Sequence, residues 1–149
     1  MCTRSFAGFA VKLKDVRKPL VFVAFAMKLV PILGTLVLLG AVVQVILGLE
    51  ITAGFDAFTG IHILLGLTGL VLVLVLAGIA FRTKTATIYS KLVITILAVI
   101  VLIQVGLGFQ LLSGADALAL SHEANGFVII IVSLLMGGIT FWTARRKLG

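Results

Sequence analysis

Two histidines are the only residues of their type in this chain of 149 residues, and they occur in matching contexts. His62 lies in the stretch 44–66, and His122 lies in the stretch 104–126, which is 60 residues further on without a gap. An imidazole is a hydrogen-bonding group and the commonest metal ligand among side chains. Two of them at equivalent positions of a duplicated segment suggest one shared site.

The histidines share a set of polar and small companions. Gln44 matches Gln104, Gly48 matches Gly108, Gly54 matches Gly114, Asp56 matches Asp116, and Gly66 matches Gly126. Between 36–82 and 96–142, 13 of 47 aligned positions are identical. Leu and Val identities are common in any apolar chain, but matches at Gln, Gly, Asp and His are not. Duplication of a two-helix hairpin is the economical explanation.

The composition indicates a membrane protein. Hydrophobic residues make up 62% of the chain, charged residues 11%, and the mean hydropathy is +1.34. A soluble domain of this length could not cover so much apolar surface. The net charge of +7 comes without a basic stripe interleaved with aromatics, so we expect no nucleic-acid partner and membrane lipid instead. The single cysteine, Cys2, excludes an internal disulfide and a CxxC motif.

Four apolar runs of about 20 residues or more are long enough to cross a bilayer as helices. They cover roughly 30–51, 57–81, 89–112 and 117–143. Gly-x-Asp breaks separate the helices within each repeat, with Asp56 and Asp116 as candidate N-caps. The sequence therefore predicts an all-α membrane protein, a four-transmembrane-helix up-down bundle made of two repeated helical hairpins.

The ends of the chain are more polar than this bundle, which we place at 30–143. The apolar stretch 20–51 would be about 48 Å long as one helix, against about 30 Å of hydrocarbon, so we expect a break near Lys28. Pro31 then suits the first turn of the spanning helix. Residues 1–29 are expected to form a cytoplasmic or interfacial amphipathic segment, and 144–149 a basic cytoplasmic tail.

The charges predict an orientation. All twelve basic residues fall at the ends of the runs that would lie on one side: Arg4, Lys12, Lys14, Arg17, Lys18, Lys28, Arg82, Lys84, Lys91, Arg145, Arg146 and Lys147. Four of the five acids fall on the other side: Glu50, Asp56, Asp116 and Glu123. We expect a multi-pass protein of a prokaryotic plasma membrane with both termini cytoplasmic.

Helix counting places the polar residues of the repeat at one depth. His62 and Gln44 each lie nine residues from Ala53, and His122 and Gln104 are related in the same way. All four should lie one and a half to two turns inside the outer surface. Ionisable residues at this depth are by default candidates for a functional site.

A haem fits this pattern because it takes two axial nitrogens on opposite faces of a flat macrocycle. The second and fourth helices should occupy diagonal corners, with His62 and His122 facing each other across the core. Glycines four residues after each glutamine or histidine should open slots beside the ligands, namely Gly48, Gly108, Gly66 and Gly126. The amide oxygens of Gln44 and Gln104 are expected to accept a hydrogen bond from the other imidazole nitrogen.

Other roles are compatible with the same residues. Each histidine would also serve as an interhelical hydrogen-bond donor, and glycines also mark close helix contacts. A chlorophyll-type pigment needs only one histidine. A zinc or copper site would want a third ligand; Glu123 is near, but Ile63 stands at the matching position. Asp56 and Asp116 read as helix caps rather than acid catalysts.

The string QVILG, followed after a Gly-rich break by a histidine early in the next helix and then repeated, resembles haem A synthase. That family typically has two four-helix halves, each holding a haem with histidines on its second and fourth helices. This chain resembles one half over about residues 30–143, and half-sized members are known. The resemblance implies His62 and His122 as the ligand pair.

Two features depart from the family pattern. Its oxidising half has a glutamate three residues before the first ligand histidine, and here those positions are Thr59 and Ala119. The family's frequent outer-loop cysteine pair is also missing from this sequence. The chain therefore looks more like the half that holds a permanent haem b.

The leading hypothesis is a membrane cytochrome with one haem b per chain, held by His62 and His122, that transfers electrons near the extracytoplasmic face. It would work as a homo-oligomer or as an accessory subunit of a membrane oxidoreductase complex, with a redox partner that the sequence does not name. The alternatives are a half-size haem A synthase acting as a homodimer, and a pigment-binding or structural subunit of a membrane complex.

Overall fold

The computed structural model describes residues 7–83 and 86–145 as an all-α chain. Its long helices are α1 (Ala7–Thr52), α2 (Thr59–Arg82), α3 (Ile88–Leu112) and α4 (Ala119–Arg145). Short 3-10 turns, η1 (Asp56–Phe58) and η2 (Asp116–Leu118), precede α2 and α4. Four helical stretches in the described residues are long and apolar enough to cross a membrane. The predicted four-helix membrane fold is confirmed.

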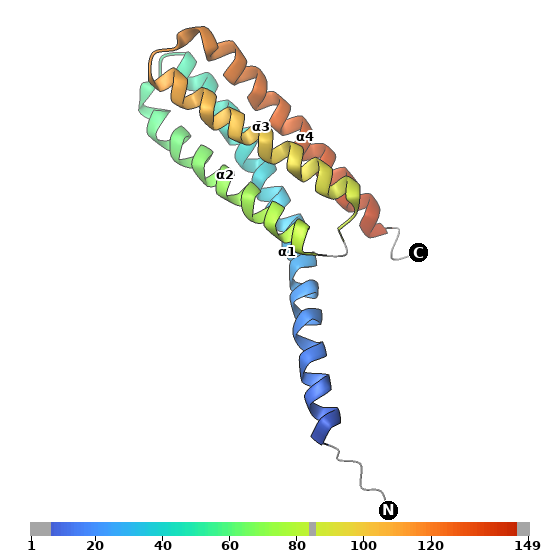
Figure 1. Ribbon diagram of the computed structural model, residues 1–149. Coiled ribbons are helices and arrows are strands. Elements are labelled where there is room, and N and C mark those ends of the chain that lie inside the picture. Colours follow the sequence, from blue (N-terminus) through green and yellow to red (C-terminus); the bar gives the residue numbers. More distant parts are fainter. Residues whose placement is uncertain (1–6, 84–85, 146–149) are drawn as a thin grey trace, which may run out of the picture.

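The four helices pack side by side along one axis (Figure 1), and each contacts two neighbours in a closed ring. Helix α1 contacts α2 and α4, and α3 contacts the same two, so that α2 and α4 lie on one diagonal as predicted. Helices α2 and α4 run parallel to each other, since each follows a tight turn at the same end of the bundle (Figure 1). Equivalent side chains of the two repeats therefore face the centre at one level.

Helix α1 differs from the expectation of a break near Lys28. It is continuous from Ala7 to Thr52, and its first part projects beyond the bundle (Figure 1). Its membrane-spanning stretch is Leu29–Thr52, so Pro31 lies inside one helix rather than in a first turn. The stretch between Gly8 and Gly34 contains no glycine, but it contains Pro19 and Pro31, each of which lacks the N–H for one helical hydrogen bond, so composition alone does not explain the continuity. Residues 1–6 and 146–149 of the predicted terminal segments lie outside the described residues.

Two glycines end the odd-numbered helices in the same way. Gly54 has φ +99° and Gly114 has φ +91°. After α1, the N–H of Phe55 donates to the carbonyl of Glu50 (3.0 Å), and the N–H of Gly54 donates to that of Ile51 (2.9 Å). This pair of bonds is the Schellman motif, whose left-handed residue is usually glycine. The equivalent turn after α3 has the same pair of bonds.

The helix starts differ from the predicted aspartate caps. Asp56 and Asp116 are the first residues of η1 and η2, and the preceding Phe55 and Ala115 occupy the N-cap positions without a side-chain hydrogen bond. The glycine turn has already reversed the chain, and one 3-10 turn then leads into the helix. The aspartates therefore mark the turn but do not cap the helix in the way predicted.

The bundle has an apolar core in the half away from these turns. Its buried members are Val37, Val73, Leu76, Ala80, Ile94, Leu97, Val101, Ile129 and Met136. The outer faces are apolar as well, with many exposed Leu, Ile, Val and Phe side chains on all four helices. Such a surface suits lipid contact. The polar residues of the repeat lie in the other half, toward the turns.

Candidate functional site

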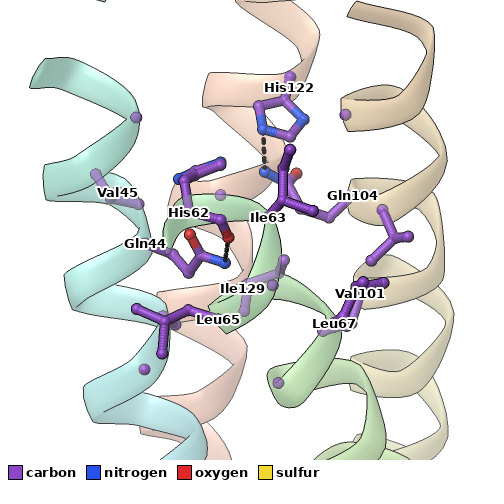
Figure 2. A pocket seen from close by; sticks show the side chains of 18 of the residues that line it. Gln44, Val45, His62, Ile63, Leu65, Leu67, Val101, Gln104, His122 and Ile129 are labelled. Atoms are coloured by element: carbon purple, nitrogen blue, oxygen red, sulfur yellow. Dashed lines mark hydrogen bonds between the residues drawn. The ribbon is translucent and has the colours of Figure 1, made fainter. Parts of the chain in front are cut away.

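The two histidines meet in the centre of the bundle. Their ring centroids are 6.0 Å apart and the ring planes are inclined by 56°. His62 comes from α2 and His122 from the diagonally placed α4, and both are half-buried (Figure 2). Within the described residues, the backbones of α2 and α4 make no close contact, so these two helices meet through side chains. The prediction that they face each other at one level is confirmed.

A cavity of about 390 Å³ surrounds this pair. Its volume falls within the usual range of small-molecule sites, about 300–1,000 Å³. Each predicted site residue contributes to its lining: Gln44, Gly48, His62, Gly66, Gln104, Gly108, His122 and Gly126. Thr59 and Ala119 also line it, so the positions where haem A synthase carries a glutamate do face the cavity here.

The glycines have a more specific role than the predicted one, which was to open slots beside the ligands. A Cβ added at Gly48 would lie 3.5 Å from Cε1 of His62, and one at Gly108 would lie 3.3 Å from Cε1 of His122. Each imidazole of α2 or α4 thus rests on a glycine of the neighbouring helix. The missing side chain makes room for the histidine ring itself.

The other two glycines make room for the glutamines in return. A Cβ at Gly66 would lie only 2.7 Å from Nε2 of Gln44, and one at Gly126 would lie 3.6 Å from Nε2 of Gln104. Within each repeat, the glutamine therefore lies over the glycine one turn after the histidine. The spacing of four residues seen in the sequence reflects this reciprocal arrangement of two antiparallel helices.

The glutamines do not make the hydrogen bonds predicted for them. Nε2 of Gln44 donates to the main-chain carbonyl of His62 at 2.8 Å and leaves its ring alone (Figure 2). Gln104 does reach a ring, but its Nε2, rather than its oxygen, lies 3.1 Å from Nε2 of His122. The two repeats share residues here but not hydrogen bonds.

Sequence reasoning missed Asn125. Its Nδ2 donates to Oε1 of Gln104 (2.8 Å) and to the main-chain carbonyl of Ile100 (2.9 Å). Comparison of the two repeats could have pointed to this residue. The first repeat has Leu65 at the matching position, so the polar side chain occurs only in the second repeat. A polar side chain that enters a membrane helix at such a place needs a partner.

Several buried polar atoms at the site have no hydrogen-bond partner. They are Oε1 of Gln44 and Nδ1 of both His62 and His122. Buried polar groups are paired in the great majority of cases, so a cluster of unpaired ones requires a reason, such as a bound group that reorients them. Three such atoms in one cavity set this site apart from an ordinary interhelical contact.

A closed metal site of the zinc type is not formed by the described residues, which contain no group of three or more His, Cys, Asp or Glu side chains placed to hold an ion. Glu123 instead lies near Thr52 of α1, whose hydroxyl donates to its Oε1 at 3.3 Å. A haem needs only two protein ligands because its macrocycle supplies four nitrogens.

Compared with known proteins, the chain matches no family model, no curated protein and no solved structure. The resemblance to haem A synthase therefore rests on the repeated motif and on His62 and His122 alone.

The spacing of the two rings would allow both to bind one metal ion, although Nε2 of His122 now faces Gln104. Bonds between a metal and an imidazole nitrogen are about 2.0–2.1 Å long, so opposed nitrogens are about 4 Å apart. In such an arrangement the ring centroids would lie farther apart than the two nitrogens. The centroids of His62 and His122 are 6.0 Å apart. The histidines, the cavity and the unpaired atoms together fit a group with two axial positions.

Proposed function

We propose that this protein is a membrane cytochrome that binds one b-type haem through His62 and His122. The observation that carries the proposal is the approach of the two imidazoles, 6.0 Å apart, from diagonal helices into one cavity. The cluster of buried polar atoms without a partner supports it, since a bound group would account for them. The haem supplies reversible one-electron transfer.

The protein's own residues would hold and shield this group. His62 and His122 would bind the iron, and Gly48 and Gly108 would leave room for the Cε1 edges of their rings beside α1 and α3. Gln44 fixes the main chain of α2 at the ligand through its bond to the carbonyl of His62. The apolar core below the cavity excludes water and, by its low dielectric, disfavours uncompensated charge.

The proposed orientation puts this site near the extracytoplasmic face. Among the described residues, Arg82, Lys91 and Arg145 lie at the end opposite the glycine turns, and Asp56 and Asp116 lie in those turns. Basic residues favour the cytoplasmic side of a membrane. Electrons would then be exchanged with a partner on the outer side of the membrane.

Single histidine variants test the ligation. We expect the full chain, purified with haem, to show a low-spin spectrum that is lost in both His62→Ala and His122→Ala. A low-spin spectrum retained in either variant would exclude bis-histidine ligation. Ser133→Val is a control on α4, because Ser133 is buried outside the cavity and Val73 is its counterpart in the first repeat.

Extraction of the bound pigment separates this proposal from the other two. We expect haem b alone. Haem O or haem A beside haem b would favour the half-size haem A synthase, acting on a haem methyl group. A chlorophyll-type pigment, or none, would favour a pigment-binding or structural subunit.

A further inference from the structure

The two halves of the site differ at one position. Three residues after His122 stands Asn125, and three residues after His62 stands Leu65. Asn125 joins α4 to α3 by two hydrogen bonds, to the carbonyl of Ile100 and to the amide oxygen of Gln104. The first repeat has no counterpart to this connection, because a leucine side chain has no donor or acceptor.

These bonds fix which atom donates to His122. A main-chain carbonyl only accepts, so the Asn125 atom beside Ile100 is its nitrogen, and that nitrogen also donates to Oε1 of Gln104. With its oxygen accepting, Gln104 presents its Nε2 to the ring. This nitrogen is a donor, so Nε2 of His122, 3.1 Å away, is the acceptor. A neutral His122 then carries its proton on Nδ1.

The first repeat has no side-chain donor at the ring of its histidine. Gln44 turns its Nε2 to the main-chain carbonyl of His62, at 2.8 Å, and its Oε1 has no partner. Among the described residues, no side chain donates to the ring of His62; its polar neighbour is the main chain of Gln44, whose carbonyl can only accept. The lone pair of Nε2 is therefore occupied in His122 and not in His62.

This difference matters for ligation. Nδ1 of each ring is buried, and Nε2 of His122 faces Gln104, so we expect Nε2 to be the atom that would bind a metal. At His122, a metal would have to displace the N–H of Gln104 from that lone pair. At His62 no such competition exists.

We propose that the Asn125–Gln104 pair makes His122 the displaceable axial ligand and His62 the permanent one. This inference rests on the proposed haem site. Asn125 acts as a positioning residue, since it reaches the ligand only through Gln104. A haem held in this way would exchange His122 for a small external ligand such as carbon monoxide.

The test compares carbon monoxide binding to the reduced, haem-loaded full chain. In Asn125→Leu, which installs the residue of the first repeat, Gln104 is free to turn away, as Gln44 does. His122 then competes better for the iron, and we expect the carbon monoxide affinity to fall about two- to tenfold, the equivalent of one net hydrogen bond. Gln104→Leu should give the same change, and the double variant no further change.

Ser133→Val serves as the matched control, because it also replaces a polar residue of α4 by its counterpart in the first repeat. We expect its carbon monoxide affinity to equal that of the unchanged chain. Equal affinity in Asn125→Leu, or a higher one, would overturn the inference while leaving the haem site intact. Absence of a haem spectrum from every protein would overturn the proposed function as well.

A second measurement does not depend on the folding of any variant. Nitrogen-15 NMR of the unchanged, haem-free chain in micelles reports the tautomer of each histidine. We expect His122 to be protonated on Nδ1 with Nε2 unprotonated. A proton on Nε2 of neutral His122 would contradict the hydrogen-bond direction on which the inference depends.

Discussion

Replacing Gly66 by alanine tests the reciprocal arrangement of glycine and glutamine most sharply. The new Cβ would lie 2.7 Å from Nε2 of Gln44, where ordinary contacts begin at 3.4 Å. The amide would have to retreat by about 0.7 Å from a hydrogen bond that is now 2.8 Å long. The bond to the carbonyl of His62 would be lost.

The cost follows from what the amide loses. Its Oε1 already has no partner, so loss of the Nε2 bond leaves the whole amide of Gln44 unpaired inside the bundle. A buried polar group without a partner costs about 1–3 kcal/mol. We expect Gly66→Ala to lower the free energy of unfolding by about this amount.

The second repeat provides the comparison. At Gly126 a Cβ would lie 3.6 Å from Nε2 of Gln104 and 3.3 Å from Cγ2 of Val45, so only an apolar methyl group must give way. We expect a smaller loss in Gly126→Ala than in Gly66→Ala. Gly78→Ala is the control on α2, because a Cβ there meets nothing within 4 Å.

Unfolding by SDS in mixed micelles, followed by circular dichroism, measures these differences. We expect the order Gly66→Ala, then Gly126→Ala, then Gly78→Ala, from most to least destabilised. Equal stability of Gly66→Ala and Gly78→Ala would show that the Gln44 side chain is not held against this glycine, and would refute the account.

Three further predictions concern the helix ends and the orientation. Gly54→Ala places a methyl group at φ +99° and should lower the free energy of unfolding in SDS by about 1–2 kcal/mol, whereas Gly60→Ala, with open space and no positive φ, should not. Thr87→Ala removes the side chain that accepts from the N–H of the third residue of α3, and should cost about 1 kcal/mol in the same assay. In an otherwise cysteine-free chain, an impermeant maleimide should label Ala57→Cys in intact cells and Ala86→Cys only after permeabilisation; the reverse pattern would invert the proposed orientation.

The sequence was a good guide to the features that the two repeats share. Apolar run length predicted four spanning helices, and the 60-residue offset predicted that His62 and His122 would meet from diagonal helices. Depth counting worked because α-helices rise by a constant amount per residue. Gly54 and Gly114 match each other in the repeat, and both turns use this glycine in a left-handed conformation.

The sequence was a poorer guide to the hydrogen bonds of the polar side chains. Gln44 and Gln104 occupy equivalent positions, yet one bonds a main-chain carbonyl and the other a ring. The second repeat differs in having Asn125 on α4, whose Nδ2 donates to Oε1 of Gln104, where the first repeat has Leu65. The predicted break near Lys28 failed because hydrocarbon thickness limits what lies in the membrane but does not oblige a helix to end there.

The most direct test of the central claim is the absorption spectrum of the purified full chain, followed by extraction of its pigment. The account predicts a Soret band that shifts and sharpens on reduction, and one haem b per chain. A colourless protein that takes up no added haem, although His62 and His122 are intact and the helices are folded, would contradict it.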